Sequence, residues 1–167
     1  MKVKIRRARP ADAVILAAAE RELAKTPGRL TSRSHELKAA NFRRAILELS
    51  SEGAYLVAVE HGRIVGHALL RRMEREANAH VRRLTIMVHE GHQGRGIGTA
   101  LLKRLMSWAR KAPGVEKIEL GVRTVNRGAV RLYKRLGFRV EGRLRKHLKL
   151  TDGSTIDDFA MGWFPRK

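Results

Sequence analysis

The spacing of hydrophobic and polar positions near the start of the chain predicts a strand followed by a helix. Apolar and basic residues alternate from Val3 to Ala8, as in a strand with one buried face. After Pro10, a residue type favoured in the first turn of helices, the spacing lengthens to that of an amphipathic helix. The side of this helix that we expect to face the core carries Val14, Ile15, Ala18 and Leu23.

The rest of the chain shows helix spacing and strand spacing in turn, with turn residues between the segments. A loop through His35 leads to a second helix over 36–50, whose apolar side carries Leu37, Phe42, Ile46, Leu47 and Leu49. Strands are predicted over 54–60, 64–71, 80–88, 117–122, 138–150 and 155–163. Two further helices are predicted over 99–111 and 126–136.

The predicted order of elements is therefore β-α-α-β-β-β-α-β-α-β-β. This order predicts an α/β fold in which a central mixed sheet carries helices on both faces. A chain of 167 residues can bury one sizeable core, and we find no repeat or long linker that divides it. We expect a single domain over residues 1–167.

Composition narrows the class of protein. Hydrophobic residues make up 43% of the chain, which indicates a globular protein rather than a disordered one. There is no cysteine, which excludes a disulfide framework and a thiolate metal site. No segment approaches the ~20 apolar residues of a membrane span, and the basic N-terminus lacks the apolar stretch of a signal peptide. A soluble cytoplasmic protein without a membrane partner is the expectation.

The formal net charge of +20 is large for a chain of this length. It favours anionic partners such as phosphates, nucleic acid or the surface of a ribosome. A solvated basic surface explains the charge equally well, so charge alone names no partner.

The stretch GHQGRGIGTALL, from Gly91 to Leu102, places four glycines between a predicted strand and a predicted helix. A helix N-terminus carries unpaired N–H groups, and glycines let a ligand approach the backbone closely, so the turn predicts an anion cradle. The P-loop spacing is not met, because Ile97 follows Gly96 where that motif has lysine. The alternative is an ordinary strand-to-helix turn.

Two motifs connect this turn to a known family. The turn reads Q-x-x-G-x-G at Gln93, Gly96 and Gly98, and the chain continues ~30 residues later with NRGAVRLYKRLGF, from Asn126 to Phe138. Together the motifs resemble the Gcn5-related N-acetyltransferase (GNAT) superfamily, and the predicted order of elements matches that family over nearly the whole chain.

The resemblance implies acetyl-CoA as co-substrate, with no metal. In the family, the pyrophosphate lies on the amides of the glycine turn and the pantetheine arm pairs with the end of the preceding strand. An asparagine contacts the arm, and a tyrosine lies near the thioester sulfur. In this chain the resemblance assigns the asparagine role to Asn126 and the tyrosine role to Tyr133. It assigns the arm to Ile86, Met87 and Val88, and the pyrophosphate to Gln93, Gly94, Arg95, Gly96, Ile97, Gly98 and Thr99.

The implied catalytic role of Tyr133 agrees with its chemistry. A tyrosine hydroxyl can give a proton or a hydrogen bond to the departing thiolate. Asn126 and Tyr133 are seven positions apart, about two helical turns, so they share a face of the predicted helix. The alternative is that Tyr133 is a core aromatic beside Leu132 and Leu136.

The group that takes the proton of the amine is left open by the sequence. In the ribosomal-protein alanine acetyltransferase branch, the strand before the asparagine carries a glutamate, and Gly121 stands there in this chain. Glu119 lies two positions earlier on the same strand face and is a candidate catalytic residue. Glu74, Glu76 and a chain of water molecules are the other candidates, and we favour the water chain.

Two further groups of polar residues invite interpretation. Asp157 and Asp158 lie on the last predicted strand, where one of them should face inward and bind the positive charge of an amine substrate; a solvated carboxylate is the alternative. His89 and His92 have no further ligands nearby in the sequence, so we interpret them as loop residues rather than as a metal site.

The function implied by the resemblance is transfer of an acetyl group from acetyl-CoA to a primary amine. Because a charge of +20 repels polycations, we rank a protein N-terminus, such as that of a ribosomal protein, and amino-acid-like amines above polyamines. The alternative is a non-catalytic protein that binds acyl-CoA or associates with ribosomes or nucleic acid. Ribosome association and a homodimer remain open at this point.

Overall fold

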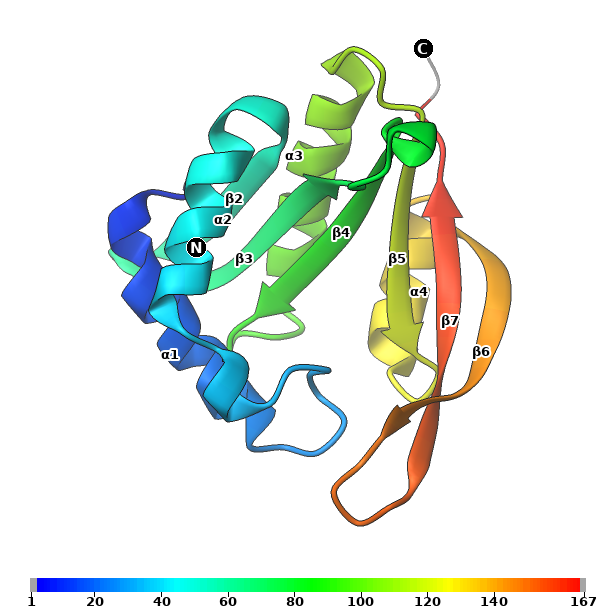
Figure 1. The fold of residues 1–167 in the computed structure, drawn as a ribbon. Helices are drawn as coiled ribbons and strands as arrows, with labels where there is room; N and C mark the ends of the chain where they lie inside the picture. Colours follow the sequence, from blue (N-terminus) through cyan, green and yellow to red (C-terminus); the bar gives the residue numbers. More distant parts are fainter. Residues whose placement is uncertain (1–2, 166–167) are drawn as a thin grey trace.

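The computed structural model describes residues 3–165, and over that range the predicted order of elements is confirmed (Figure 1). Three short 3-10 helices, at Pro10–Asp12, Ser34–Glu36 and Glu76–Asn78, lie between the main elements. The main elements are β1 (Lys4–Arg7), α1 (Ala13–Ala24), α2 (Ala39–Glu52), β2 (Ala54–Glu60), β3 (Arg63–Arg72), β4 (Val81–Val88), α3 (Ile97–Lys111), β5 (Lys117–Arg123), α4 (Arg127–Arg135), β6 (Arg139–Lys149) and β7 (Thr155–Trp163).

The strands form one mixed sheet in the order β1-β2-β3-β4-β5-β7-β6. Its neighbouring strands are antiparallel except for β4 and β5, which run parallel. That parallel pairing covers only Val81–Arg83 against Lys117–Glu119, and the two strands then diverge toward their C-terminal ends. The sheet is therefore open as a wedge beyond Arg83 and Glu119.

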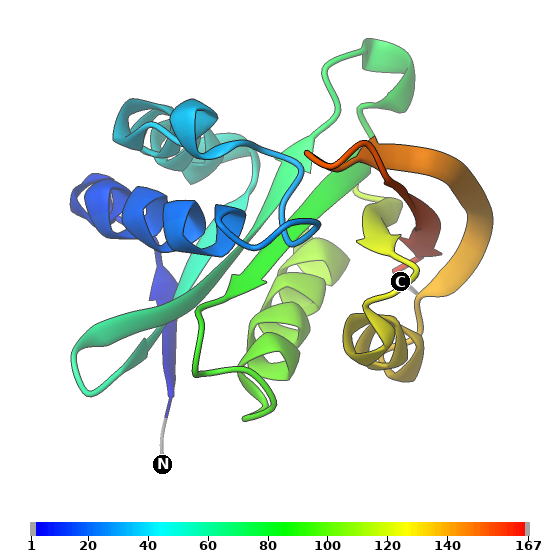
Figure 2. The same ribbon diagram turned by 90° about the horizontal axis from the view of Figure 1, so that it is seen from below.

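Helices cover both faces of the sheet, as predicted (Figure 2). The larger core contains α3 and α4 packed on one face, with Leu101, Leu105, Ile118 and Tyr133 among its buried residues. The smaller core contains α1 and α2 on the other face. None of the helices within residues 3–165 is long and apolar enough to cross a membrane.

The face of α1 that meets the core differs from the prediction. Val14 and Ile15 are 64% and 51% exposed, and Ala18 is exposed too. Apolar residues occupy every side of this helix in its first two turns, so the sequence pattern does not select one face. The buried positions, at helical spacing, are Ala13, Leu16, Ala17 and Leu23.

The second helix starts three residues later than predicted. Residues Ser34–Glu36 form a 3-10 turn in which a carboxylate oxygen of Glu36 accepts a hydrogen bond from the backbone N–H of Arg33 at 2.6 Å. The backbone leaves helical geometry at Leu37, which is nevertheless buried. Ile46 and Leu49 are buried as predicted, whereas Leu47 is 54% exposed because it lies on the far side of α2.

The orientation of α1 is testable with two neighbouring residues. Leu16→Ala should lower the free energy of unfolding by about 2–5 kcal/mol, because it empties a fully buried position. Ile15→Ala should lower it by about 0.5 kcal/mol or less, because that side chain is half exposed. Urea denaturation of both variants measures the difference, and a larger loss for Ile15→Ala would contradict this orientation.

Candidate active site

A cavity of about 520 Å³ lies beside the end of β4, between the glycine turn and α4. Of the twelve residues predicted to hold the acyl donor, eleven line it, and Arg95 is the exception. Leu23, Arg29, His92, Gly128, Ala129, Leu132 and Arg135 complete the lining and were not predicted. The two sequence motifs thus identify most of the residues that line the cavity. Leu23 of α1 and Arg29 of the loop after it reach the cavity through tertiary packing, which a local motif does not record.

The glycine turn is open toward this cavity. Gly91, Gly94 and Gly96 have φ angles of 76°, 75° and 80°, and a Cβ at any of them would have no neighbour within 4 Å. Gly96 is the N-cap of α3, and its position has no side-chain cap. The first amides of α3 are therefore available to an anion, in the arrangement that binds phosphate at helix N-termini.

Gly98 has a packing role beside the cradle. A Cβ at this position would lie 3.3 Å from Cδ2 of Leu132, so the missing side chain lets α4 approach the start of α3 closely. This approach brings Asn126 and Tyr133 to the same cavity as the turn. The glycine spacing thus serves both the cradle and the contact between two helices.

Two side chains of the turn, Gln93 and Arg95, form hydrogen bonds with residues of β4 and β2. The Nε2 of Gln93 donates a hydrogen bond to the carbonyl oxygen of Val88 at 3.2 Å, which ties the turn to the end of β4. The Nη2 of Arg95 donates to Oε1 of Glu60 at 2.7 Å. The expected extra positive charge of Arg95 is therefore paired with a carboxylate of β2, and its guanidinium does not line the cavity.

The end of β4 offers a free strand edge. Ile86, Met87 and Val88 pair on one side with β3, and beyond Arg83 no β5 residue pairs with the other side. An extended ligand can add to such an edge through backbone hydrogen bonds. This is the arrangement that the predicted binding of the pantetheine arm requires.

Helix α4 and its N-cap contribute Tyr133 and Asn126 to the lining of the cavity. The side-chain oxygen of Asn126 accepts a hydrogen bond from the N–H of Ala129 at 3.1 Å and so caps the helix. The NH₂ group of the Asn126 side-chain amide can still donate hydrogen bonds. Tyr133 is buried, and burial raises the pKa of its hydroxyl to about 12. Tyr133 therefore stays protonated at neutral pH and can act as a proton donor.

The structure does not bring Glu119 to this cavity. One carboxylate oxygen of Glu119 lies 2.8 Å from Nη2 of Arg83, and the other lies 4.0 Å from Nζ of Lys117. These contacts hold it where β4 and β5 are still paired. Gly121, two residues further, is exposed on the same strand face. A Cβ there would lie 3.6 Å from Oδ2 of Asp158, so a carboxylate from β7 occupies the space beside Gly121.

Asp158 is the inward-facing member of the aspartate pair, as expected for one of the two. It is 4% exposed, and its Oδ2 accepts a hydrogen bond from Nη1 of Arg123 at 2.6 Å. Nδ1 of His147 lies 3.6 Å from the same oxygen. Oδ1 of Asp158 is buried without a hydrogen-bond partner in residues 3–165, and Asp158 is not among the residues that line the cavity.

Asp157 lies on the solvent side of the same strand. It accepts hydrogen bonds from the backbone N–H of Lys146 at 2.7 Å and from Nε of Arg143 at 2.8 Å. These two hydrogen bonds lower the pKa of its carboxyl below the usual value, and the bond from the backbone of Lys146 has the larger effect. Asp157 thus holds the hairpin of β6 and β7 together.

The loop between α1 and α2 is linked to the sheet through Arg123, the partner of Asp158. Nη2 of Arg123 donates to the hydroxyl of Thr31 at 2.7 Å, which links the loop to β5. Arg29 of the same loop lines the cavity and has no ion-pair partner among the described residues. The contacts of Arg123 could not be read from the sequence, because they depend on the register of β5 with β7 and on the path of a distant loop.

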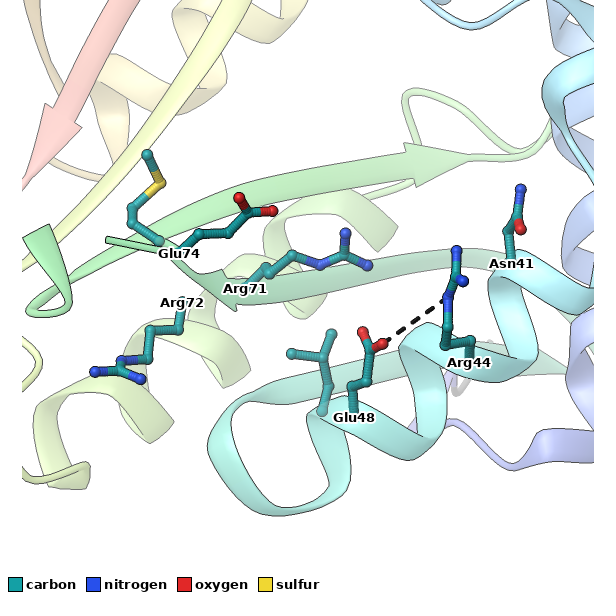
Figure 3. A pocket seen from close by; sticks show the side chains of 8 residues that line it. Asn41, Arg44, Glu48, Arg71, Arg72 and Glu74 are labelled. Atoms are coloured by element: carbon teal, nitrogen blue, oxygen red, sulfur yellow. Dashed lines mark ion pairs between the residues drawn. The ribbon is translucent and has the colours of Figure 1, made fainter. Parts of the chain in front are cut away.

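A second cavity, of about 650 Å³, lies between α2 and the end of β3 (Figure 3). It shares no lining residue with the first cavity. Glu74, a candidate base, lines this second cavity, where Arg44 and Glu48 form an ion pair of 3.9 Å. Glu74 is therefore placed away from the cavity that the motifs define.

The histidines of the turn form no metal site. Residues 3–165 contain no group of three or more His, Cys, Asp or Glu side chains that could hold a metal ion. His92 lies 3.6 Å from Oε2 of Glu60. Burial lowers the pKa of His89 to about 4, so its ring is neutral at physiological pH.

Two curated proteins show what the chain is similar to. The first is the L-amino acid N-acetyltransferase AaaT of Escherichia coli (strain K12), 32% identical over 64% of this chain and 65% of that protein. The second is the N-alpha-acetyltransferase RimI of Mycobacterium tuberculosis, 36% identical over 61% of this chain and 62% of that protein. The matches thus span slightly less than two thirds of these relatives.

A solved structure shows the same fold as this chain, and a family model matches most of its length. The structure of yncA from Salmonella typhimurium with its cofactor acetyl-CoA matches with a TM-score of 0.90 at 22% identity, covering 100% of this chain and 96% of that one. The model of the acetyltransferase (GNAT) family matches residues 17–138. That range contains the glycine turn, Asn126 and Tyr133, and on these grounds the chain belongs to the acetyltransferase (GNAT) family.

Proposed function

We propose that this protein transfers an acetyl group from acetyl-CoA to a primary amine. The observation that carries the proposal is one cavity in which an anion cradle, a free strand edge and a buried tyrosine hydroxyl meet. These three features suit the pyrophosphate, the pantetheine arm and the thioester sulfur in that order along the donor. The acetyl-CoA bound to yncA, a protein of the same fold, supports this choice of donor.

The reaction needs one bond formed and one broken. The amine nitrogen attacks the carbonyl carbon of the thioester, and the carbon–sulfur bond breaks with its electron pair left on sulfur. In our proposal Tyr133 gives that sulfur a proton and regains one as the amine nitrogen loses its protons. The remaining proton passes to solvent through water, because none of the candidate bases Glu74, Glu76 and Glu119 lines the cavity.

We propose that Asp158 receives the ammonium group of the acceptor. Its Oδ1 is buried and unpaired among the described residues, and an ammonium group is a donor with matching charge. The Arg123 guanidinium balances the charge of the carboxylate before the acceptor arrives. Asp157, the other substrate-binding candidate, then shapes the hairpin beside Asp158 through its bond to Lys146.

The acceptor in this proposal is the α-amino group of an amino acid or of a protein N-terminus. Arg29 supplies an unpaired guanidinium at the cavity that suits the carboxylate or carbonyl next to such an amine. The names of the two relatives, an L-amino acid N-acetyltransferase and an N-alpha-acetyltransferase, support the same class. The net charge of +20 disfavours polyamines and is compatible with an acceptor presented on ribosomal RNA.

Binding of acetyl-CoA at the glycine turn is testable by thermal denaturation. Acetyl-CoA should raise the Tm of the parent protein, because a ligand that binds only the native state stabilises it. Gly96→Val should abolish this shift, since a β-branched residue is strained at a φ of 80° and obstructs the cradle. Gly114→Val, at a φ of 69° between α3 and β5, should lose comparable stability and keep the shift. A shift retained in Gly96→Val would place the donor elsewhere.

The role of Tyr133 is testable by kinetics. Tyr133→Phe removes one hydroxyl, so kcat should fall ~10²-fold or more, while the Kd for acetyl-CoA stays nearly the same. Because burial raises the pKa of Tyr133 to about 12, the hydroxyl should stay protonated and kcat should show no alkaline decline from this group below pH ~10. A variant as active as the parent would leave Tyr133 with a packing role.

The acceptor class is testable with a panel of amines. Release of free CoA thiol should be fastest with amino acids or with an alanine- or serine-starting peptide, and slower with spermidine and kanamycin. Asp158→Asn should lower kcat/KM for the best acceptor ~10-fold or more and leave the Kd for acetyl-CoA unchanged. Higher salt should improve any activity on polycations by screening repulsion. Preference for spermidine at low salt would contradict the charge argument, and no thiol release with any amine would favour a non-catalytic acyl-CoA-binding protein.

A further inference from the structure

Glu60, the last residue of β2, carries a carboxylate that is buried although it lies at the end of a strand. The residue is 6% exposed. A carboxylate is seldom buried unless it is paired, because desolvation of the charge is costly. The partners of Glu60 therefore indicate why the charge is kept there.

Both partners of Glu60 come from the glycine turn. Its Oε1 accepts a hydrogen bond from Nη2 of Arg95 at 2.7 Å, and its Oε2 lies 3.6 Å from Nδ1 of His92. Nη1 of Arg95 lies 3.1 Å from that same His92 nitrogen, so the three side chains form a closed cluster. Because β3 lies between β2 and β4 in the sheet, this cluster binds the turn to a strand that is not its neighbour.

The other hydrogen bonds of the turn are local: Nε2 of Gln93 donates to the carbonyl oxygen of Val88, and the N–H of His92 donates to the carbonyl oxygen of His89. A Cβ at Gly91, Gly94 or Gly96 would find no atom within 4 Å, so these three positions offer no side chain that could anchor the turn to the rest of the molecule. Glycines also lose more conformational entropy on ordering than other residues. A fixed contact at Arg95, between Gly94 and Gly96, therefore reduces the freedom that a ligand must otherwise remove on binding.

We propose that Glu60 is a positioning residue that pre-organises the pyrophosphate cradle through Arg95 and His92. This inference rests on the proposed binding of acetyl-CoA at the turn. Glu60 does not line the cavity, so it acts on the ligand through the turn alone. Its effect should appear in the affinity for ligands that carry the pyrophosphate and not in the chemical step.

The charges in the cluster predict an order among variants. Arg95→Met removes the guanidinium partner of the buried Glu60 carboxylate and leaves that charge with only His92, at 3.6 Å, next to the site of an anion. This change both strains the cluster and repels the phosphates. Glu60→Gln removes the carboxylate charge and keeps an acceptor for Arg95. The double variant Glu60→Gln/Arg95→Met has neither charge, so it should bind CoA more tightly than Arg95→Met does.

The experiment compares two acyl donors. CoA binding is measured by isothermal titration calorimetry, and steady-state kinetics are measured with acetyl-CoA and with S-acetyl-pantetheine, which lacks the pyrophosphate. Glu60→Gln should raise the Kd for CoA ~10-fold and the KM for acetyl-CoA similarly, with kcat unchanged. With S-acetyl-pantetheine, kcat/KM should equal that of the parent.

Asp12→Asn is a matched control. Asp12 is 7% exposed and is paired with Arg6 at 2.7 Å, so it resembles Glu60 in burial and in partner, but it precedes α1 and lies outside the cavity. Its loss should lower stability and leave the Kd for CoA unchanged. The thermal denaturation curve of each variant establishes that it is folded.

Several results would overturn the inference. Glu60→Gln binding CoA as tightly as the parent would do so, as would an equal loss of kcat/KM with both donors. A double variant that binds CoA no better than Arg95→Met would also contradict it, and this comparison remains available if Glu60→Gln does not fold. Failure of the parent protein to bind CoA would instead contradict the proposed function.

Discussion

The site depends on two parallel strands that are paired at one end only. β4 and β5 share three residues of ladder and then diverge, while β4 stays paired with β3 as far as Val88 and β5 stays paired with β7 as far as Arg123. The inner edges past Arg83 and Glu119 are left with peptide groups that have no strand partner. Such groups need hydrogen bonds from elsewhere, so an extended ligand gains affinity from the same opening that interrupts the sheet.

The helices complete the site around this opening. α3 starts directly after the turn that follows β4 and directs its N-terminal amides to the end of the wedge. α4 comes close to α3 because Gly98 has no side chain to separate them, and this contact brings Tyr133 to the cavity. The proposed donor site and the proposed proton donor thus depend on one helix contact as well as on the open edge.

Charge around the site is organised in pairs although the chain is strongly basic. The chain has 36 basic and 16 acidic residues, and three carboxylates of the sheet each have an arginine partner: Glu60 with Arg95, Asp158 with Arg123, and Glu119 with Arg83. Pairing cancels most of the local field of each group. The local field in the cavity is therefore set by unpaired lining groups such as Arg29, while the net charge acts at longer range.

The carboxylate beside Gly121 comes from a neighbouring strand of the sheet. A glycine on β5 leaves space above the strand, and the Asp158 side chain of β7 approaches that space to 3.6 Å. Because Gly121 pairs with Ala160 and Arg123 with Asp158, the two strands present these residues on the same face of the sheet. A search of one strand for a carboxylate would miss a group that a neighbouring strand supplies.

The sequence by itself determined the order of elements, the glycine turn and the residues Asn126 and Tyr133. These are local features, since the period of apolar positions and the spacing of glycines act within one or two turns of chain. The tertiary structure decided which side of α1 is buried, that Arg95 pairs with Glu60, and that Glu119 lies outside the cavity. It also joined Arg123 to Asp158 and to Thr31, residues 35 and 92 positions away. Such contacts follow from strand register and loop packing, which arise only when distant segments meet, so no local pattern records them.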